Sequence, residues 1–182
     1  MTRIDSQNFT TLLDTIAQRR SAGDGRVSAE SSTHIPEVRA AGIPQEVKDA
    51  LQPADTGMLD QLNHTRAAAY TYAQRVLAGD ISREQFEDLI NQLMDSDQTQ
   101  FTQLQDSTKA NLQSLGHQHP DWQVMILSVF GSVTDLQIDV LTKEFNFLQL
   151  LMSNTPQQEG QVNGFFSDLM RHLQDGWSQI VG

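Results

Sequence analysis

Two acid and histidine pairs come closest to a chemical site in this sequence. Asp60 is followed four residues later by His64, and Asp168 is followed by His172 at the same spacing. A spacing of four places each pair on one face of a helix, so two facing helices that carried these pairs would be able to hold a metal ion. The glutamates and the Glu-x-x-His pairs of a di-iron bundle are missing, however. Surface pairs are therefore the simpler interpretation, and we rank a metal-binding bundle third among the functions that the sequence suggests.

The remaining chemical motifs are weaker. His117 and His119 alternate in a loop beside Asp121, where histidines are more often polar connectors than metal ligands. Asp95 and Asp97 resemble the start of a calcium loop, but the required glycine and closing glutamate are missing. The sequence also lacks cysteine, a Gly-rich phosphate loop and a serine nucleophile within a motif. We therefore expect a non-enzymatic protein that uses no cofactor and binds no metal.

Helices would have to position any such residues, and the strongest helical pattern runs from Asp121 to Met152. Apolar residues recur there in steps of three and four and form two adjacent stripes, interrupted by Lys143 and Thr134. A helix that is apolar over most of its circumference cannot stand alone, so other segments must cover it on two faces. The first stripe contains Ile126, Val129, Val133, Leu136, Val140, Phe147 and Leu150. The second stripe contains Leu127, Phe130, Ile138, Leu141, Phe145, Leu148 and Met152. The polar seam beside them contains Ser128, Ser132, Asp135, Asp139, Thr142, Asn146 and Gln149.

The sequence predicts two helices in the first half of the bundle domain. A short helix over 45–51 should end at Pro53, because proline cannot continue the hydrogen-bond ladder. A longer helix, capped by Asp55 or Thr56, then runs to about Ala78.

Turn and capping signals mark the next helices. Gly79 should cap the preceding helix, and Ser82 followed by Gln85 is a capping box. The helix that it opens extends to about residue 115, and the polar patch 95–100 leaves open whether this is one helix or two; we favour one.

A second capping box, Thr155 with Gln158, is expected to start a last helix that reaches Val181. Together these patterns predict an all-α fold, an antiparallel bundle of about four main helices that occupies residues 43–182.

Residues 1–42 form a separate N-terminal segment. The pattern predicts a short amphipathic helix over 6–20, followed by a flexible linker rich in Gly and Ser over 21–42. A lone amphipathic helix of this length is marginal, so it is expected to order only when it docks on a partner or on its own bundle. Tyr70 and Tyr72 cannot both face inward, so one of them is expected to be exposed for a partner. The candidate partner-binding residues are therefore Phe9, Leu12, Leu13, Ile16, Tyr70 and Tyr72.

Composition restricts the class of partner. The 182 residues carry a formal net charge of -11, which disfavours nucleic acid and anionic membranes. The N-terminus lacks the apolar core and cleavage site of an export signal, and the most apolar run, 124–133, is too short to cross a bilayer. We therefore expect synthesis in the cytosol, no stable membrane span, and a protein partner or self-association.

The N-terminal composition resembles that of proteins exported by bacterial type III secretion systems. The start MTRIDSQNFTTLLDTI is rich in Ser, Thr, Asn and Gln, no cysteine occurs, and an acidic helical remainder follows. The resemblance implies an uncleaved export signal, a secretion chaperone as partner, and a role as a secreted apparatus or tip-associated component or an effector. The alternative is a cytosolic adaptor or regulator that is not exported and docks its N-terminal helix onto its own bundle.

Overall fold

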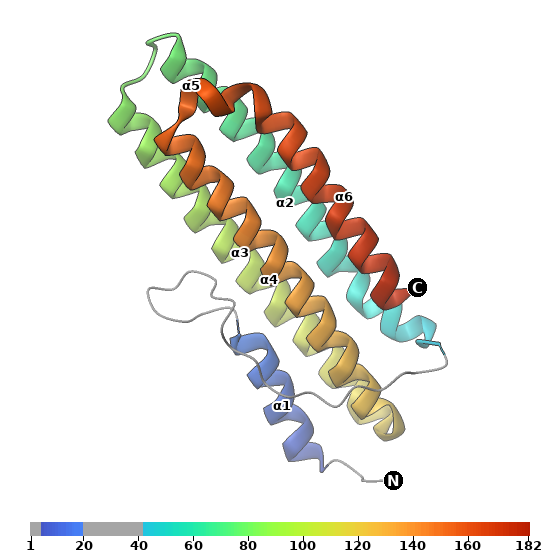
Figure 1. Cartoon of the computed structure of the whole chain (residues 1–182). Helices are drawn as coiled ribbons and strands as arrows, with labels where there is room; N and C mark the ends of the chain where they lie inside the picture. Colours follow the sequence, from blue (N-terminus) through green and yellow to red (C-terminus); the bar gives the residue numbers. More distant parts are fainter. Residues whose placement is uncertain (1–4, 20–41) are drawn as a thin grey trace.

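The computed structural model describes residues 5–19 and 42–182 and contains no strand in these ranges, which confirms the all-α prediction (Figure 1). Most of the predicted linker over 21–42 lies outside the described residues. The long helices are α2 (Gln45–Leu77), α3 (Arg83–Gln118), α4 (Gln123–Ser153) and α6 (Val162–Val181), preceded by the short helix α1 (Ser6–Gln18). Three single turns complete the described elements: η1 (Pro120–Trp122), α5 (Thr155–Gln158) and η2 (Glu159–Gln161).

The four long helices lie alongside one another and form a helical bundle (Figure 1). α4 packs between α3 and α6, and α2 packs against both α3 and α6, so that the four helices enclose a common core. α1 contacts α3 and α4 and lies beside one half of their length. The helix with the broadest apolar surface is thus covered by α3, α6 and α1.

Burial along α4 follows the two predicted stripes. Ile126, Val133 and Val140 in the first stripe are fully buried, and so are most members of the second. The polar seam is exposed or half-buried along its whole length. Leu150 departs from the prediction, because it is 51% exposed in the last turn of the helix.

A layer of buried polar side chains divides the interior into two apolar cores. Gln105 of α3 donates its amide N–H to Oε1 of Gln137 on α4, and Thr134 Oγ1 donates to Oε1 of Gln105 over 3.1 Å. Gln137 in turn donates to the Ala54 carbonyl of α2 over 3.4 Å. We call these residues the glutamine layer. The distal core on one side includes Met58, Leu62, Phe86, Met94, Phe101, Leu148 and Phe166, and the proximal core on the other includes Phe9, Leu13, Ile16, Leu51, Leu112, Ile126 and Phe130.

The capping box at the start of α3 is confirmed. The Gln85 backbone N–H donates to Ser82 Oγ over 3.1 Å, and the Ser82 N–H donates to Gln85 Oε1 over 2.8 Å. α3 continues without interruption to Gln118, as the single-helix interpretation predicted. Gly79 follows α2 with φ of +80°, and the Asp80 N–H reaches back to the Arg75 carbonyl over 2.9 Å, the pattern of a glycine helix cap.

The predicted break at Pro53 is wrong, because α2 runs through the proline. Val47 and Leu51 before the proline are fully buried, and so are Ala54 and Met58 after it. Packing of this continuous apolar face holds both parts in one helix, whereas the exposed Pro53 removes only one backbone hydrogen bond.

The predicted capping box at Thr155 is also wrong. Thr155 is buried, and its hydroxyl donates over 2.7 Å to the Leu151 carbonyl in the last turns of α4. The hydroxyl is therefore not available to cap the next helix. The chain instead forms the single turns α5 and η2, and α6 begins at Val162.

Replacing Pro53 by alanine should stabilise the protein. Alanine supplies the backbone N–H that the carbonyl of Asp49 lacks as a hydrogen-bond partner, and it removes the clash of the proline ring. A proline costs about 3 kcal/mol in an ideal helix interior and less where the helix has already adjusted to it. We expect P53A to raise the free energy of unfolding by about 1–2 kcal/mol in urea titrations. Q52A, at the neighbouring exposed position, serves as the control and should change it little. Destabilisation by P53A would contradict this account of α2.

Candidate functional site

The two acid and histidine pairs do not come together. Asp168 forms an ion pair with Arg171 on its own helix over 3.1 Å, and His172 Nε2 lies 2.8 Å from Asp139 Oδ2 on α4. Asp60 and His64 are exposed on α2. Within 5–19 and 42–182, no group of three or more His, Asp or Glu side chains is arranged to hold a metal ion. The possible pairing across two helices, which the sequence left as the less favoured interpretation, is therefore not formed by these residues.

The loop histidines have aromatic neighbours. His119 stacks on Trp122 with ring centroids 3.8 Å apart, and His117 meets the ring of Phe9 edge-on at 6.3 Å. Both side chains thus take part in packing at the junction of α3 and α4.

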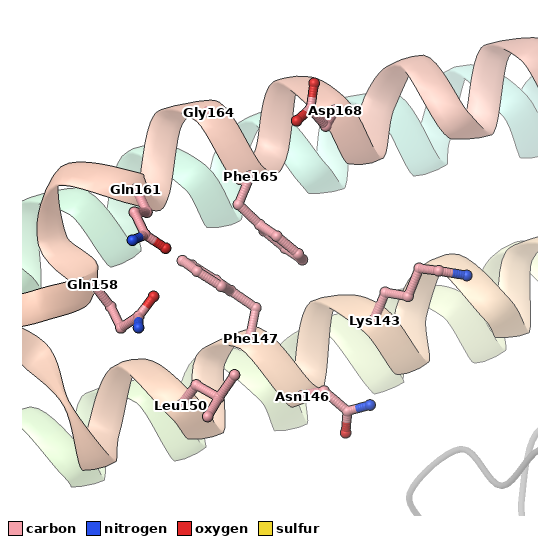
Figure 2. A pocket seen from close by; sticks show the side chains of 9 residues that line it. All are labelled: Lys143, Asn146, Phe147, Leu150, Gln158, Gln161, Gly164, Phe165 and Asp168. Atoms are coloured by element: carbon pink, nitrogen blue, oxygen red, sulfur yellow. The ribbon is translucent and has the colours of Figure 1, made fainter.

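An open pocket of about 810 Å³ lies between α4 and α6 (Figure 2). Phe147 and Phe165 point toward one another there and stack with centroids 4.0 Å apart. The charged residues at its edge have partners on their own helices: Lys143 pairs with Asp139, and Asp168 with Arg171. The pocket therefore offers an aromatic surface without the convergent polar groups that orient a small ligand.

The most specific contact surface in the described residues is the groove that α3 and α4 form around α1. Phe9, Leu13 and Ile16 are at most 1% exposed, and Ala17 is 2% exposed. These residues recur at helical spacing and enter the proximal core. Leu12 differs from the other candidate partner-binding residues of this helix because it is 37% exposed.

A notch at the end of α3 receives the aromatic ring of α1. Gly116 is buried in the last turn of α3, and a Cβ added there would overlap Cε1 and Cζ of Phe9. The missing side chain thus creates the space for the ring. Gln123 holds the notch in place, since its amide donates to the Gly116 carbonyl over 2.9 Å.

Polar contacts on either side of the apolar face set the position of α1. Lys109 Nζ lies 2.9 Å from Asp14 Oδ1, and Arg19 Nη1 lies 2.6 Å from Asp135 Oδ1. Arg19 is 5% exposed although its partner is largely exposed. The groove therefore recognises a helix by an aromatic residue in the notch and by one acid and one base at fixed positions.

Tyr70 and Tyr72 lie elsewhere, on α2, and both are half-buried against the distal core. The Tyr70 hydroxyl accepts a hydrogen bond from Gln74 over 3.0 Å. The expectation that one of the two tyrosines is exposed is therefore wrong, because a half-buried position accommodates each ring at the edge of the core. Their use as partner contacts stays a prediction.

Sequence reasoning missed the carboxyl pair of Asp97 and Glu144. Glu144 on α4 is fully buried, and Asp97 on α3 is fully buried beside it, where Thr65 Oγ1 of α2 donates to Asp97 Oδ2 over 2.6 Å. Burial raises the pKa of both carboxyls, and for Glu144 the negative charge of Asp97 raises it further. A signal was present: Gln137, Glu144 and Leu151 follow one another at steps of seven and belong to neither apolar stripe nor to the polar seam.

α4 also bears on the expectation that no segment spans a membrane. By length and composition the helix 120–153 is apolar enough to cross one: its most apolar 18-residue stretch has a mean hydropathy of 1.6, and 67% of that stretch is buried inside the bundle. The core helix of a soluble bundle passes the same test, so the finding neither confirms nor excludes a membrane span.

Comparisons with protein families, with characterised proteins and with solved structures found no match for this chain.

The notch predicts a double-mutant cycle. G116A should destabilise docking of α1 by about 1–3 kcal/mol, because the added methyl group overlaps the Phe9 ring while alanine suits α3 itself. Hydrogen exchange of the α1 amides should accelerate, and the fluorescence of Trp122 and Trp177, which pack on the proximal core, should change.

In the double variant G116A/F9A the methyl group occupies space that the ring has vacated. The effect of G116A should therefore be smaller in the F9A background than in the wild-type chain. Additive effects of the two substitutions would contradict direct contact between Phe9 and Gly116.

Proposed function

We propose that this chain is a non-enzymatic interaction protein whose groove between α3 and α4 binds an amphipathic helix of a partner protein in place of α1. The observation that carries the proposal is the occupation of this groove by α1. A helix of 13 residues is marginal by itself, so it depends on the groove for its order. Its apolar contacts belong to the proximal core alone.

Release of α1 would leave the bundle supported. The glutamine layer and the distal core are built from α2, α3, α4 and α6 without any residue of α1. The sequence places 22 residues, 20–41, between the described parts, which is enough chain for α1 to leave the groove while it stays attached. The groove would then expose Leu112, Ile126 and Phe130 to a partner helix.

The partner's helix is expected to resemble α1 in its pattern. It would place an aromatic residue over Gly116, aliphatic residues four and seven positions later, an acid near Lys109 and a base near Asp135. An acid and a base in opposite places would meet like charges at both sites, which supplies selectivity.

Capture of partners in the native host tests this function. The full chain is cross-linked there as the wild type, as L13D and as L12D. Leu13 is fully buried in the groove, so L13D should free α1 and increase the yield of captured partner by severalfold. L12D, which changes an adjacent and partly exposed residue of the same type, should behave as the wild type.

A peptide with the sequence of residues 5–19 should displace the captured partner from L13D, because both compete for one groove. Equal capture by all three chains, or capture that the peptide leaves unchanged, would contradict the proposal.

We also propose that the N-terminal segment directs export through a type III secretion system, in which case a secretion chaperone is one of its partners. The N-terminal composition supports this proposal. A reporter fused after residue 40 should be exported by a secretion-competent strain and retained by a strain that lacks the secretion apparatus. Retention in both strains would leave the cytosolic adaptor as the better description.

A further inference from the structure

The centre of the distal core contains a group of polar side chains without complete hydrogen bonding. Glu144 of α4 and Asp97 of α3 have no exposed surface, and Gln61 of α2 is 2% exposed. Asp97 Oδ2 accepts from the Thr65 hydroxyl over 2.6 Å. Asp97 Oδ1, both carboxyl oxygens of Glu144 and both amide atoms of Gln61 have no hydrogen-bond partner. An unpaired buried polar atom costs about 1–3 kcal/mol, so this arrangement needs a further bonding element.

No arginine or lysine of the described residues neutralises the two carboxyls. In the described ranges, neither Asp97 nor Glu144 forms an ion pair with arginine or lysine. The groups that act on them are Thr65, Gln61 and His64 from α2 and the two carboxyls themselves from α3 and α4, while none from α6 contributes. Two charges buried side by side without a counterion are strongly unfavourable, so at least one carboxyl must be neutral.

We propose that Asp97 and Glu144 share a single proton at neutral pH and thereby form a proton-dependent clamp between α3 and α4. Glu144 carries the proton and donates it as an O–H to the unpaired Oδ1 of Asp97. Gln61 needs only a side-chain rotation to donate its amide to the other oxygen of Glu144. Thr65 continues to donate to Asp97 Oδ2, so that every carboxyl oxygen of the pair has a partner.

A proton fits this site better than a divalent metal ion does. Ca²⁺ and Mg²⁺ require about six or more oxygen ligands, and fully buried sites must supply them without water. The site supplies two carboxyls, no third His, Asp or Glu side chain of the described residues joins them, and the apolar distal core surrounds the pair. This inference is independent of the function proposed for the α1 groove, which lies in the proximal core.

The proton makes stability depend on pH with a definite sign. Burial raises the pKa of Glu144 well above its unfolded value of about 4.5, so the folded state retains a proton that the unfolded chain has already released. The stabilising effect is complete below the unfolded pKa and is lost as pH rises through the folded pKa. At pH values between the unfolded and the folded pKa of Glu144, the one retained proton makes the unfolding equilibrium constant increase by up to tenfold per pH unit.

Urea unfolding of the full chain between pH 5 and pH 9 tests the inference. The wild type should lose stability with rising pH by this slope. E144Q keeps the shape and can donate an amide N–H to Asp97, so its slope should be smaller and its stability at the alkaline end should exceed that of the wild type. E84Q, which changes an exposed glutamate of α3, should run parallel to the wild type.

D97N and infrared spectroscopy provide independent readouts. D97N removes the neighbouring negative charge and should also reduce the slope. The wild-type chain at neutral pH should show the carbonyl band of a neutral carboxylic acid, and this band should be missing in E144Q. The inference is overturned if E144Q keeps the wild-type slope, if the wild type lacks the band, or if Ca²⁺, Mg²⁺ or Mn²⁺ stabilises the wild type but not E144Q, because a metal ion would then occupy the site.

Discussion

The need to bury α4 on nearly all sides determines the arrangement of this protein. An isolated helix with two apolar stripes would expose its apolar surface to water, at a cost of roughly 25 cal/mol for each Å² of apolar surface. α3 and α6 cover α4 laterally, α2 closes the core between them, and α1 covers the remaining part beside α3. The polar seam faces solvent, together with Lys143 and with Leu150 near the end of the helix. The α1 groove and the buried carboxyl pair both follow from this arrangement, since each forms where α4 meets α3.

Local signals in the sequence were sufficient wherever the structure depends on neighbouring residues alone. The periodicity of α4, the capping box at Ser82 and the glycine cap at Gly79 each act within a few residues, and all three are confirmed. Predictions failed where tertiary contacts outweigh local preference. α2 continues through Pro53 because buried residues on both sides pack on one face, and the Thr155 hydroxyl turns back to α4 instead of capping α6.

The polar interior was missed for a different reason. Asp, Glu and Gln are usually exposed, and a pattern search that assigns residues to an apolar or a polar face places them outside. Gln137 and Glu144 are buried because Gln105 and Asp97 stand opposite them on α3, and one sequence does not reveal which residues of another helix lie opposite. The candidate residues of α1 were accessible to sequence reasoning because their apolar spacing is local, but the notch at Gly116 was not.

The two polar sites together fix the alignment of the long helices. Gln137 and Glu144 are seven residues apart on α4, and their partners Gln105 and Asp97 are eight apart on α3, so both pairs lie at matching heights. A shift of α3 by one turn against α4 would separate both pairs at once and leave several buried groups unpaired, at about 1–3 kcal/mol each. α1 has no partner in either polar site, and ion pairs at the edge of the groove together with the Phe9 notch set its position. Salt and water weaken contacts at an edge far more than contacts in a dry core, so the ion pairs of α1 should be more sensitive to salt than the two polar sites that align the long helices.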